Sequence, residues 1–235
     1  MNKKIGIIIY ARTSSKRFPN KIFKKIFEFK MIELIIKRIK KINLKKNDCE
    51  LIVNTSLDKS DNKIISFCKK NKIKYFRGSL SNVFLRTYEC LKQNNYKFFV
   101  RVNCDRPLLD FEMILRMINL IIKRKNIDII SNCTGDYPKG LACEIARSKI
   151  FFNNINRIKT KGDKEHIFNF FYKNSSQFKI LKISDKLYEE NKNINLSVDN
   201  KGDLKKINKI FKFFNKKYLI STRKVLKNIK KIKLE

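Results

Sequence analysis

Short apolar runs alternate with longer segments in which apolar residues recur every three or four positions along the first 131 residues. The short runs predict strands at 5–10, 49–53, 73–76, 98–102 and 127–131. The longer segments predict amphipathic helices at 31–42, 61–71, 82–93 and 111–123. Strands that alternate with helices at this spacing form right-handed βαβ units. The chain is therefore predicted to be an α/β protein with a doubly wound, mostly parallel sheet.

The first apolar run, IGIIIY at 5–10, is rich in β-branched residues and has no polar alternation. Such runs occur in strands that are buried on both faces of a parallel sheet. We therefore expect this run to be the central strand.

The second half of the chain has a less regular pattern. Its helices are predicted at 148–154, 164–173, 204–214 and 222–233, and its strands at 178–183 and 194–198. The segment 135–140 contains glycine and proline and is predicted to be a loop. Because there is no internal repeat and no linker, the 235 residues are expected to form a single domain, 1–235.

Positive charge is spread over the whole sequence. The 56 lysines and arginines against 21 aspartates and glutamates give a formal net charge of +35. Such a balance is typical of proteins that bind nucleic acid or another anionic surface, and this function is one alternative. The lysines are, however, interleaved with isoleucine and asparagine, as A/T-rich codons dictate, and are not gathered in one arm. We therefore expect no specific nucleic acid as a partner.

Six cysteines lie far apart without any C-x-x-C pair, and His166 is the only histidine in the sequence. This pattern excludes the usual zinc arrangements and a disulfide framework, and it predicts a reducing, cytoplasmic location. The apolar run at the N-terminus is stopped by Arg12 and is too short for a typical signal peptide. No stretch approaches the length of a membrane span, so no membrane partner is expected.

A basic segment rich in hydroxyl groups follows the first predicted strand. Its polar side chains are those of Arg12, Ser14, Ser15, Lys16, Arg17 and Lys21. Open α/β sheets bind ligands at the carboxyl ends of their strands, so the segment is predicted to bind a polyphosphate. From the residues alone, a solvated basic loop is an equally good interpretation. Since neither G-x-x-x-x-G-K-[ST] nor G-x-G-x-x-G is present, side-chain charge and hydroxyl groups would hold the anion.

Two aspartates that follow predicted strands are candidates for a metal site. Asp105 lies where a carboxylate can hold a metal ion beside a phosphate, and Asp199 follows the last predicted strand. Each also has a simpler interpretation, Asp105 as a turn residue and Asp199 as the N-cap of the next helix. Asp110 is expected only to cap the helix that follows it.

The segment 11–21, ARTSSKRFPNK, resembles the A-R-x-x-S-x-R-x-P-x-K signature of the CMP-sugar synthetases. These are cytidylyltransferases that activate sialic-type and 3-deoxy-octulosonic acids, and the spore-coat-polysaccharide type is the most similar. The segment 100–110 resembles V-R-x-x-G-D-x-P-L-x-D, and 198–204 resembles V-D-x-x-x-D-L; both supply a metal carboxylate in the family. The resemblance therefore implies a nucleotide-diphospho-sugar transferase fold with Mg²⁺ held by Asp105 and Asp199.

A third segment, 76–86, resembles F-R-G-S-x-x-D-V-x-x-R, which lies near the nucleotide in the family. The resemblance implies that Arg77 contacts the nucleotide. Arg86 lies within a predicted helix and is equally suited to pair with a surface acid such as Glu89.

Two weaker segments, 137–144 and 164–166, resemble Y-P-D-G-L-D-V-E and R-E-H, which flank the sugar in the family. Lys139 and Ala142 each replace an expected carboxylate, and Cys104 replaces the usual glycine beside Asp105. His166 is either a general base or, more simply, a packing or hydrogen-bonding histidine. A nucleotidyltransferase-like protein with lost or changed activity is therefore a second alternative.

With the resemblance, the sequence predicts an Mg-dependent cytidylyltransferase that transfers CMP from CTP to an acidic sugar, releasing pyrophosphate, for surface polysaccharide. Arg12 and Lys21 are the predicted catalytic cations, since they would neutralise the triphosphate. Ser15, Arg77 and Asp105 are the predicted nucleotide contacts. The resemblance to the family also implies a homodimer.

Overall fold

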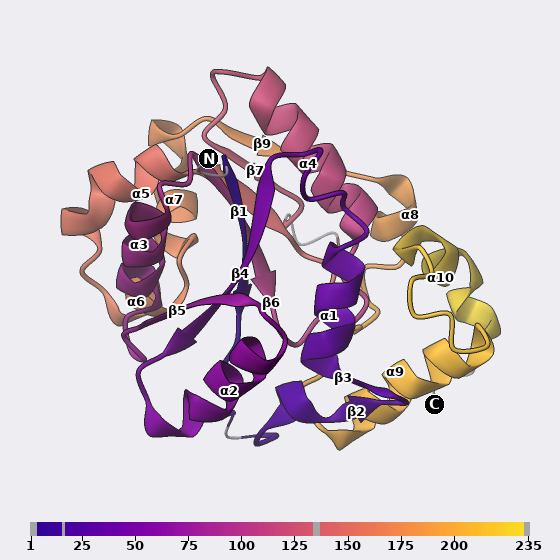
Figure 1. Cartoon of the computed structure of the whole chain (residues 1–235). Coiled ribbons are helices and arrows are strands. Elements are labelled where there is room, and N and C mark those ends of the chain that lie inside the picture. The colour runs from indigo at the N-terminus through magenta and orange to yellow at the C-terminus, as the bar shows by residue number, and fades with distance from the viewer. Residues whose placement is uncertain (1–3, 16, 134–136, 233–235) are drawn as a thin grey trace.

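A computed structural model describes residues 4–15, 17–133 and 137–232, and within them the main sheet has seven strands (Figure 1). The strands lie in the order β5-β4-β1-β6-β8-β7-β9. Their bounds are β1 Ile5–Tyr10, β4 Cys49–Ser56, β5 Lys74–Gly78, β6 Phe98–Asn103, β7 Ile129–Ser131, β8 Glu144–Arg147 and β9 Ile180–Lys182. Neighbouring strands are parallel except at β8, which is antiparallel to β6 and β7. The predicted mostly parallel sheet is confirmed.

Strand β1 is buried on both faces, as its β-branched sequence predicts. It pairs with β4 on one side and β6 on the other. Ile7 and Ile9 pack in one hydrophobic core, and Ile8 packs in the other. β1 is therefore an interior strand, but the middle position among the described strands belongs to β6, so the prediction of a central strand is wrong by one place.

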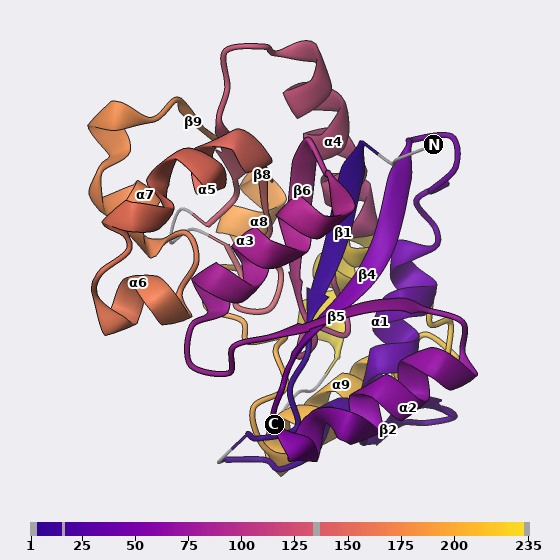
Figure 2. The same ribbon diagram turned by 60° about the vertical axis from the view of Figure 1, so that its left-hand side comes forward.

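Helices cover both faces of the sheet (Figure 2), which makes it doubly wound. Helices α1, α2, α4, α9 and α10 contribute to one core, and α3, α5 and α7 contribute to the other. The helix bounds are α1 Met31–Ile39, α2 Asn62–Lys70, α3 Val83–Asn94, α4 Phe111–Lys123, α5 Ser148–Asn154, α6 Lys161–Glu165, α7 Asn169–Lys173, α8 Lys186–Glu189, α9 Lys201–Phe213 and α10 Thr222–Asn228.

The second half of the chain departs from its prediction in several places. The predicted helix 164–173 is two helices, α6 and α7, because the backbone leaves the helical conformation at His166 (φ −105°, ψ 90°). The segment 194–198 is not a strand: only Asn195 makes a bridge, to Lys139, and its Oδ1 accepts the Ser197 N–H at 3.0 Å. This local bond competes with a regular ladder. Strand β8 and a small hairpin, β2 Lys25–Ile26 and β3 Phe29–Lys30, had no clear sequence signal.

The tail predicted as the helix 222–233 forms α10 and a 3-10 turn, Ile229–Lys231. Val225 and Leu226 are buried, so the helix is amphipathic and packs with one face on the domain. Residue 233 lies outside the described residues, as do Lys16 and positions 134–136, which overlap the predicted loop 135–140.

A close backbone approach at Gly140 joins the loop 137–141 to the segment before Asp199. Gly140 has a φ of 97°, and a Cβ there would lie 2.5 Å from the carbonyl carbon of Leu196. Only glycine adopts this conformation and leaves room for the neighbouring backbone. The Leu196 N–H donates to the Lys139 carbonyl at 2.7 Å, and the Val198 N–H donates to the Asp105 carbonyl at 2.9 Å. Asp199 is therefore held beside Asp105.

All six cysteines are free thiols, and all except the half-buried Cys133 are buried. The five buried thiols pack in the two hydrophobic cores. In the described parts of the chain, no helix is both long enough and apolar enough to cross a membrane.

Candidate active site

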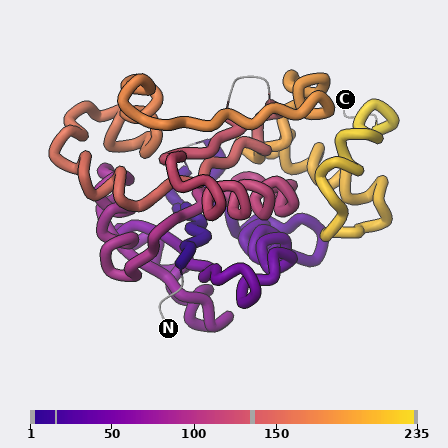
Figure 3. The backbone as a smooth tube through the Cα atoms, turned by 90° about the horizontal axis from the view of Figure 1, so that it is seen from above, coloured from indigo at the N-terminus to yellow at the C-terminus, as the bar shows by residue number. Residues whose placement is uncertain are grey.

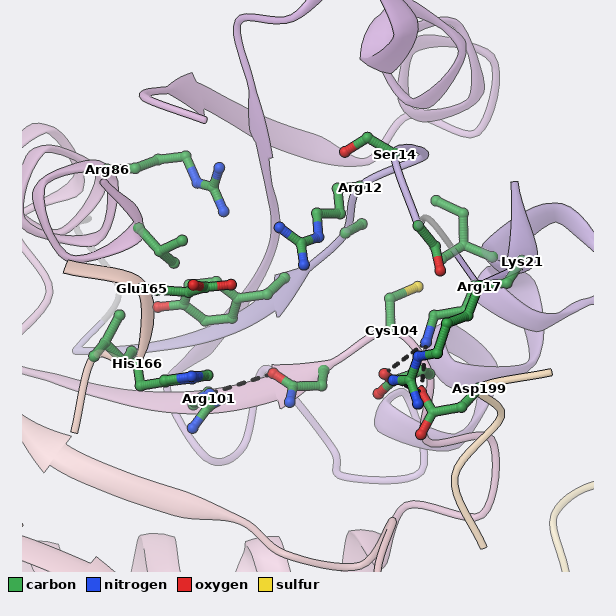
Figure 4. A pocket seen from close by; sticks show the side chains of 18 residues that line it. Arg12, Ser14, Arg17, Lys21, Arg86, Arg101, Cys104, Glu165, His166 and Asp199 are labelled. Carbon is green, nitrogen blue, oxygen red and sulfur yellow. Dashed lines mark hydrogen bonds and ion pairs between the residues drawn. The ribbon is translucent and has the colours of Figure 1, made fainter. Parts of the chain in front are cut away.

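A cavity of about 600 Å³ lies at the carboxyl ends of β1 and β6 (Figure 4). Its walls come from the loop after β1, the 3-10 turn Lys21–Phe23, α3, the end of β6, the turn after α6, and Asp199. Figure 4 shows Arg12 between two groups of side chains. The first group, here the carboxylate end, contains Lys21 and Asp199. Asp105 belongs to it because its Oδ2 lies 2.9 Å from Lys21 Nζ. The second group, here the arginine end, contains Arg86, Arg101, Glu165 and His166.

The loop after β1 is fixed by Asp61, a buried aspartate at the end of the 3-10 turn before α2. Its Oδ1 accepts hydrogen bonds from the backbone N–H and the hydroxyl of Thr13, at 2.7 and 2.8 Å. Its Oδ2 accepts from the hydroxyl groups of Ser56 (2.5 Å) and Thr55 (3.1 Å). Burial opposes ionisation, but these bonds outweigh it and hold the pKa of Asp61 below its ordinary value. The sequence showed Asp61 only as the start of a helix.

We expect Asp61→Asn to lower the free energy of unfolding by about 2 kcal/mol, because an amide cannot accept all of these hydrogen bonds. Since the folded pKa of Asp61 is depressed, its contribution exists above the unfolded value of about 3.9 and is lost as the pH falls through the folded value. Urea unfolding of both proteins at neutral and acidic pH measures this difference. Asp58→Asn is the control at neutral pH, since Asp58 is exposed and asparagine caps a turn equally well. An unchanged stability at neutral pH would contradict the role of Asp61.

At the carboxylate end, one ammonium group joins two aspartates. Lys21 Nζ lies 2.9 Å from Asp105 Oδ2 and 3.2 Å from Asp199 Oδ1, and it also donates to the carbonyl of Val198 at 2.9 Å. Only 13% of the Lys21 side chain is exposed. The structure therefore brings together three of the predicted site residues, which lie 178 positions apart at most.

Asp199 has two further cationic partners. Lys139 Nζ lies 2.7 Å from Asp199 Oδ2, and Arg17 Nη2 lies 3.2 Å from Oδ1. Partial burial opposes ionisation of Asp199, but the hydrogen bonds from Lys139 and Lys21 lower its pKa to about 2. The carboxylate is thus ionised throughout the physiological range.

The donors at the carboxylate end fit a hard divalent cation. Mg²⁺ is typically held by one or two carboxylates together with phosphate oxygens and water. Here the Asp105 and Asp199 carboxylates are close enough to contact the same cation, the ammonium of Lys21. Within the described residues no three His, Cys, Asp or Glu side chains form a complete metal site, so a ligand would have to complete the shell. The alternative that Asp199 caps the next helix is wrong, because Asn200 is the N-cap of α9. Asp110 does cap α4, as predicted.

At the arginine end, Arg101 projects from β6 and is held by two neighbours. Its Nη1 lies 3.1 Å from Oε1 of the buried Glu144, and its Nε donates to Asn103 Oδ1 at 3.3 Å. Burial lowers the pKa of Arg101, but Glu144 outweighs burial and raises it. The pair had no signal in the sequence, since it joins strands that are 43 positions apart.

Arg86 also reaches this end of the cavity. It is only 3% exposed, and its Nη1 donates to the Ser79 carbonyl at 2.9 Å. The alternative that Arg86 pairs with Glu89 on the surface is therefore wrong. His166 is exposed and lines the cavity beside Glu165, so it is not a packing histidine.

The remaining predicted site residues separate into two groups. Arg12 and Ser15 line the cavity. Arg77 does not line it; its Nε donates to the Ser56 carbonyl at 3.0 Å and its Nη2 to the Asp58 carbonyl at 3.2 Å. Arg77 therefore braces the ends of β4 and β5, and the structure does not bring its side chain to the other site residues.

A family profile described as cytidylyltransferase matches residues 6–234, nearly the whole chain. The chain belongs to the cytidylyltransferase family. The expected family is thereby confirmed.

Three proteins are similar to this chain over most of its length. An uncharacterized protein of Methanocaldococcus jannaschii is 32% identical over 212 residues, which cover 90% of this chain and 85% of that protein. The spore coat polysaccharide biosynthesis protein SpsF of Bacillus subtilis is 25% identical over 168 residues, which cover 69% and 68% of the two chains. A cytidylyltransferase structure from Leptospira borgpetersenii has a TM-score of 0.87 at 23% identity and covers 97% of this chain and 94% of that one. This last likeness confirms the fold.

Proposed function

We propose that this protein transfers CMP from CTP to an acidic sugar, with release of pyrophosphate, in the synthesis of a surface polysaccharide. The observation that carries the proposal is the carboxylate end, where Asp105 and Asp199 share the Lys21 ammonium at the strand ends of a cytidylyltransferase fold. The similarity to SpsF, which is named for spore coat polysaccharide biosynthesis, supports a sugar as the acceptor.

In this proposal the triphosphate lies along Arg12, Ser15 and Lys21, which line one continuous cavity. Asp105 and Asp199 would hold Mg²⁺ beside it, and the ion would withdraw charge from the phosphate oxygens. Lys21 then exchanges part of its carboxylate contacts for phosphate oxygens. Because Arg12 and Lys21 already line the cavity, they would stabilise charge that grows in the transition state more than charge in the ground state.

The arginine end would take the acceptor. Arg101 lines the cavity, and its orientation is fixed by Glu144 and Asn103, so it can bind the carboxylate of an acidic sugar without reorganising. A hydroxyl oxygen of the sugar attacks the α-phosphorus in line, and the hydroxyl proton is released to water. The bond from that phosphorus to the bridging oxygen breaks, and pyrophosphate leaves with the bonding electrons. No covalent enzyme intermediate is required.

The test is pyrophosphate release by the purified protein with Mg²⁺, with CTP, UTP, GTP and ATP each offered against a panel that includes N-acetylneuraminate and 3-deoxy-manno-octulosonate. We expect release with CTP and an acidic sugar only, and its loss on addition of EDTA. Release that is independent of the sugar, or a preference for another nucleotide, would contradict the proposal.

The net charge of +35 keeps the basic binding protein as a second candidate. That function predicts nucleic-acid binding that weakens steeply with salt, and no thermal stabilisation by Mg·CTP. If pyrophosphate release is absent and the melting temperature does not change with Mg·CTP, this candidate replaces the enzyme.

A further inference from the structure

Backbone contacts hold Lys139 beside Asp199. Its carbonyl accepts the Leu196 N–H at 2.7 Å, and it forms a bridge with Asn195, so its backbone is fixed alongside the segment that leads to Asp199. From there its ammonium reaches Asp199 Oδ2 at 2.7 Å, the shortest of the three cation contacts of that carboxylate. The backbone of Lys139 is therefore fixed within reach of Asp199.

The charges around the carboxylate end oppose the binding of a free divalent cation. Among the described residues, the carboxylates of Asp105 and Asp199 are in contact with the three cationic groups of Arg17, Lys21 and Lys139. A bare divalent ion would have to displace an ammonium and enter a cluster that is already net positive. A complex of the same ion with a nucleoside triphosphate is net negative, and the same cluster attracts it.

Lys21 and Lys139 both contact Asp199, but they differ in exposure and in the number of their other acceptors. Lys21 is 13% exposed and has three acceptors, including the Val198 carbonyl. Lys139 is 61% exposed, contacts Asp199 through Oδ2 and does not line the cavity. Lys139 can therefore leave Asp199 at little cost when a metal complex arrives, and removing its charge leaves the cavity wall intact.

We propose that Lys139 acts as a built-in counter-ion that keeps divalent metal out of the free protein, so that the ion binds only together with the nucleotide. This inference rests on the metal site of the proposed function. Lys139 is a positioning residue here: it acts through Asp199, and it makes no contact with the reacting atoms.

The test measures binding of Mn²⁺ alone, as a probe for Mg²⁺, by the loss of the electron paramagnetic resonance signal of the aquo ion. Binding of Mn·CTP is measured by the rise in melting temperature, because CTP itself removes the aquo-ion signal. The free wild-type protein is expected to bind Mn²⁺ only weakly and to bind Mn·CTP well. Lys139→Met, which keeps the aliphatic stem without the charge, should raise the affinity of the free protein for Mn²⁺ at least about tenfold. Lys139→Arg should behave like the wild type. Lys149→Met, at an exposed lysine of α5, is the matched control and should change nothing.

A second substitution locates the effect. The double variant Lys139→Met/Asp199→Asn should lose the gained Mn²⁺ binding, because it no longer has the Asp199 carboxylate that Lys139 contacts in the wild type. If Lys139→Met binds Mn²⁺ no better than the wild type, while Mn·CTP still binds, the inference is wrong and the proposed function stands. If no protein in the series binds Mn·CTP, both the metal site of the proposed function and this inference fail.

Discussion

Replacing Asp105 with asparagine should lower kcat for pyrophosphate release by at least about 10³-fold and leave the protein folded. Asp105 Oδ2 lies 2.9 Å from Lys21 Nζ, and the side chain is 27% exposed, so the substitution fits without a steric conflict. The backbone carbonyl of Asp105, which accepts the Val198 N–H, is untouched. What is lost is one negative charge that orients Lys21 and that would hold the metal ion. The measurements are kcat with CTP and the free energy of unfolding in urea.

Lys21→Met should lose as much activity as Asp105→Asn, and the double variant should lose little more than either. Groups that act as one unit give such non-additive losses. Asp128→Asn is the control: its Oδ2 accepts the Lys179 N–H at 3.0 Å at the start of β9, away from the cavity, and its kcat should equal that of the wild type. A folded Asp105→Asn protein with more than a tenth of wild-type turnover would exclude Asp105 from the site.

The fold of the first half was predictable because its elements are specified by local pattern. The alternation of short apolar runs with amphipathic segments needs no knowledge of distant contacts, and α4 begins and ends where the pattern predicts. Strand β8 was not predictable. It begins with Glu144, whose charge is tolerated in a buried strand only because Arg101 on β6 pairs with it. A short strand stabilised by a distant partner gives no periodic signal.

The same contrast between local pattern and distant contacts decides which parts of the site could be predicted. Arg12, Lys21, Asp105 and Asp199 stand in recognisable motifs, and the structure places all four at one cavity. The sequence did not show which charge meets which, because that depends on the path of the loops. The contact of Lys139 with Asp199 requires Gly140 to pass close to the backbone of residue 196.

Arg77 shows the converse failure. It matches a motif, yet its guanidinium donates to the carbonyls of Ser56 and Asp58 and so braces the sheet. A guanidinium that is needed for structure and one that is free for a ligand look identical in a sequence, because the distinction is made by carbonyl groups elsewhere in the fold.

Arg38 leads to the second large prediction, which concerns folding. It is fully buried in α1, and Figure 3 shows the C-terminal segment beside this helix. Its guanidinium donates to the carbonyls of Leu109 (2.9 Å), Tyr218 (2.8 Å) and Ile220 (2.9 Å), and to the hydroxyl of Thr222 (3.0 Å). Burial lowers the pKa of Arg38 to about 10, so it is still charged at neutral pH. One side chain thus ties α1, the loop before α4 and the C-terminal segment together.

We expect Arg38→Met to lower the free energy of unfolding by about 3–5 kcal/mol, a large part of the stability of an ordinary domain. Methionine fills much of the space but leaves several buried carbonyl groups without donors, and each unsatisfied group costs about 1–3 kcal/mol. Arg38→Lys should recover only part of the loss, since a lysine lacks the planar fork that reaches several acceptors at once.

The control for this prediction is Lys37→Met, at the neighbouring exposed position of the same helix, which should unfold close to the wild type in urea. Because Arg38 does not line the cavity, the Arg38→Met protein that remains folded should keep the wild-type kcat per folded molecule. A single ordinary hydrogen bond contributes about 1 kcal/mol. If the free energy of unfolding of Arg38→Met is within about 1 kcal/mol of that of Lys37→Met, the role of Arg38 is contradicted. A loss of kcat without a loss of stability would place Arg38 in the catalytic apparatus, where the geometry of the cavity does not put it.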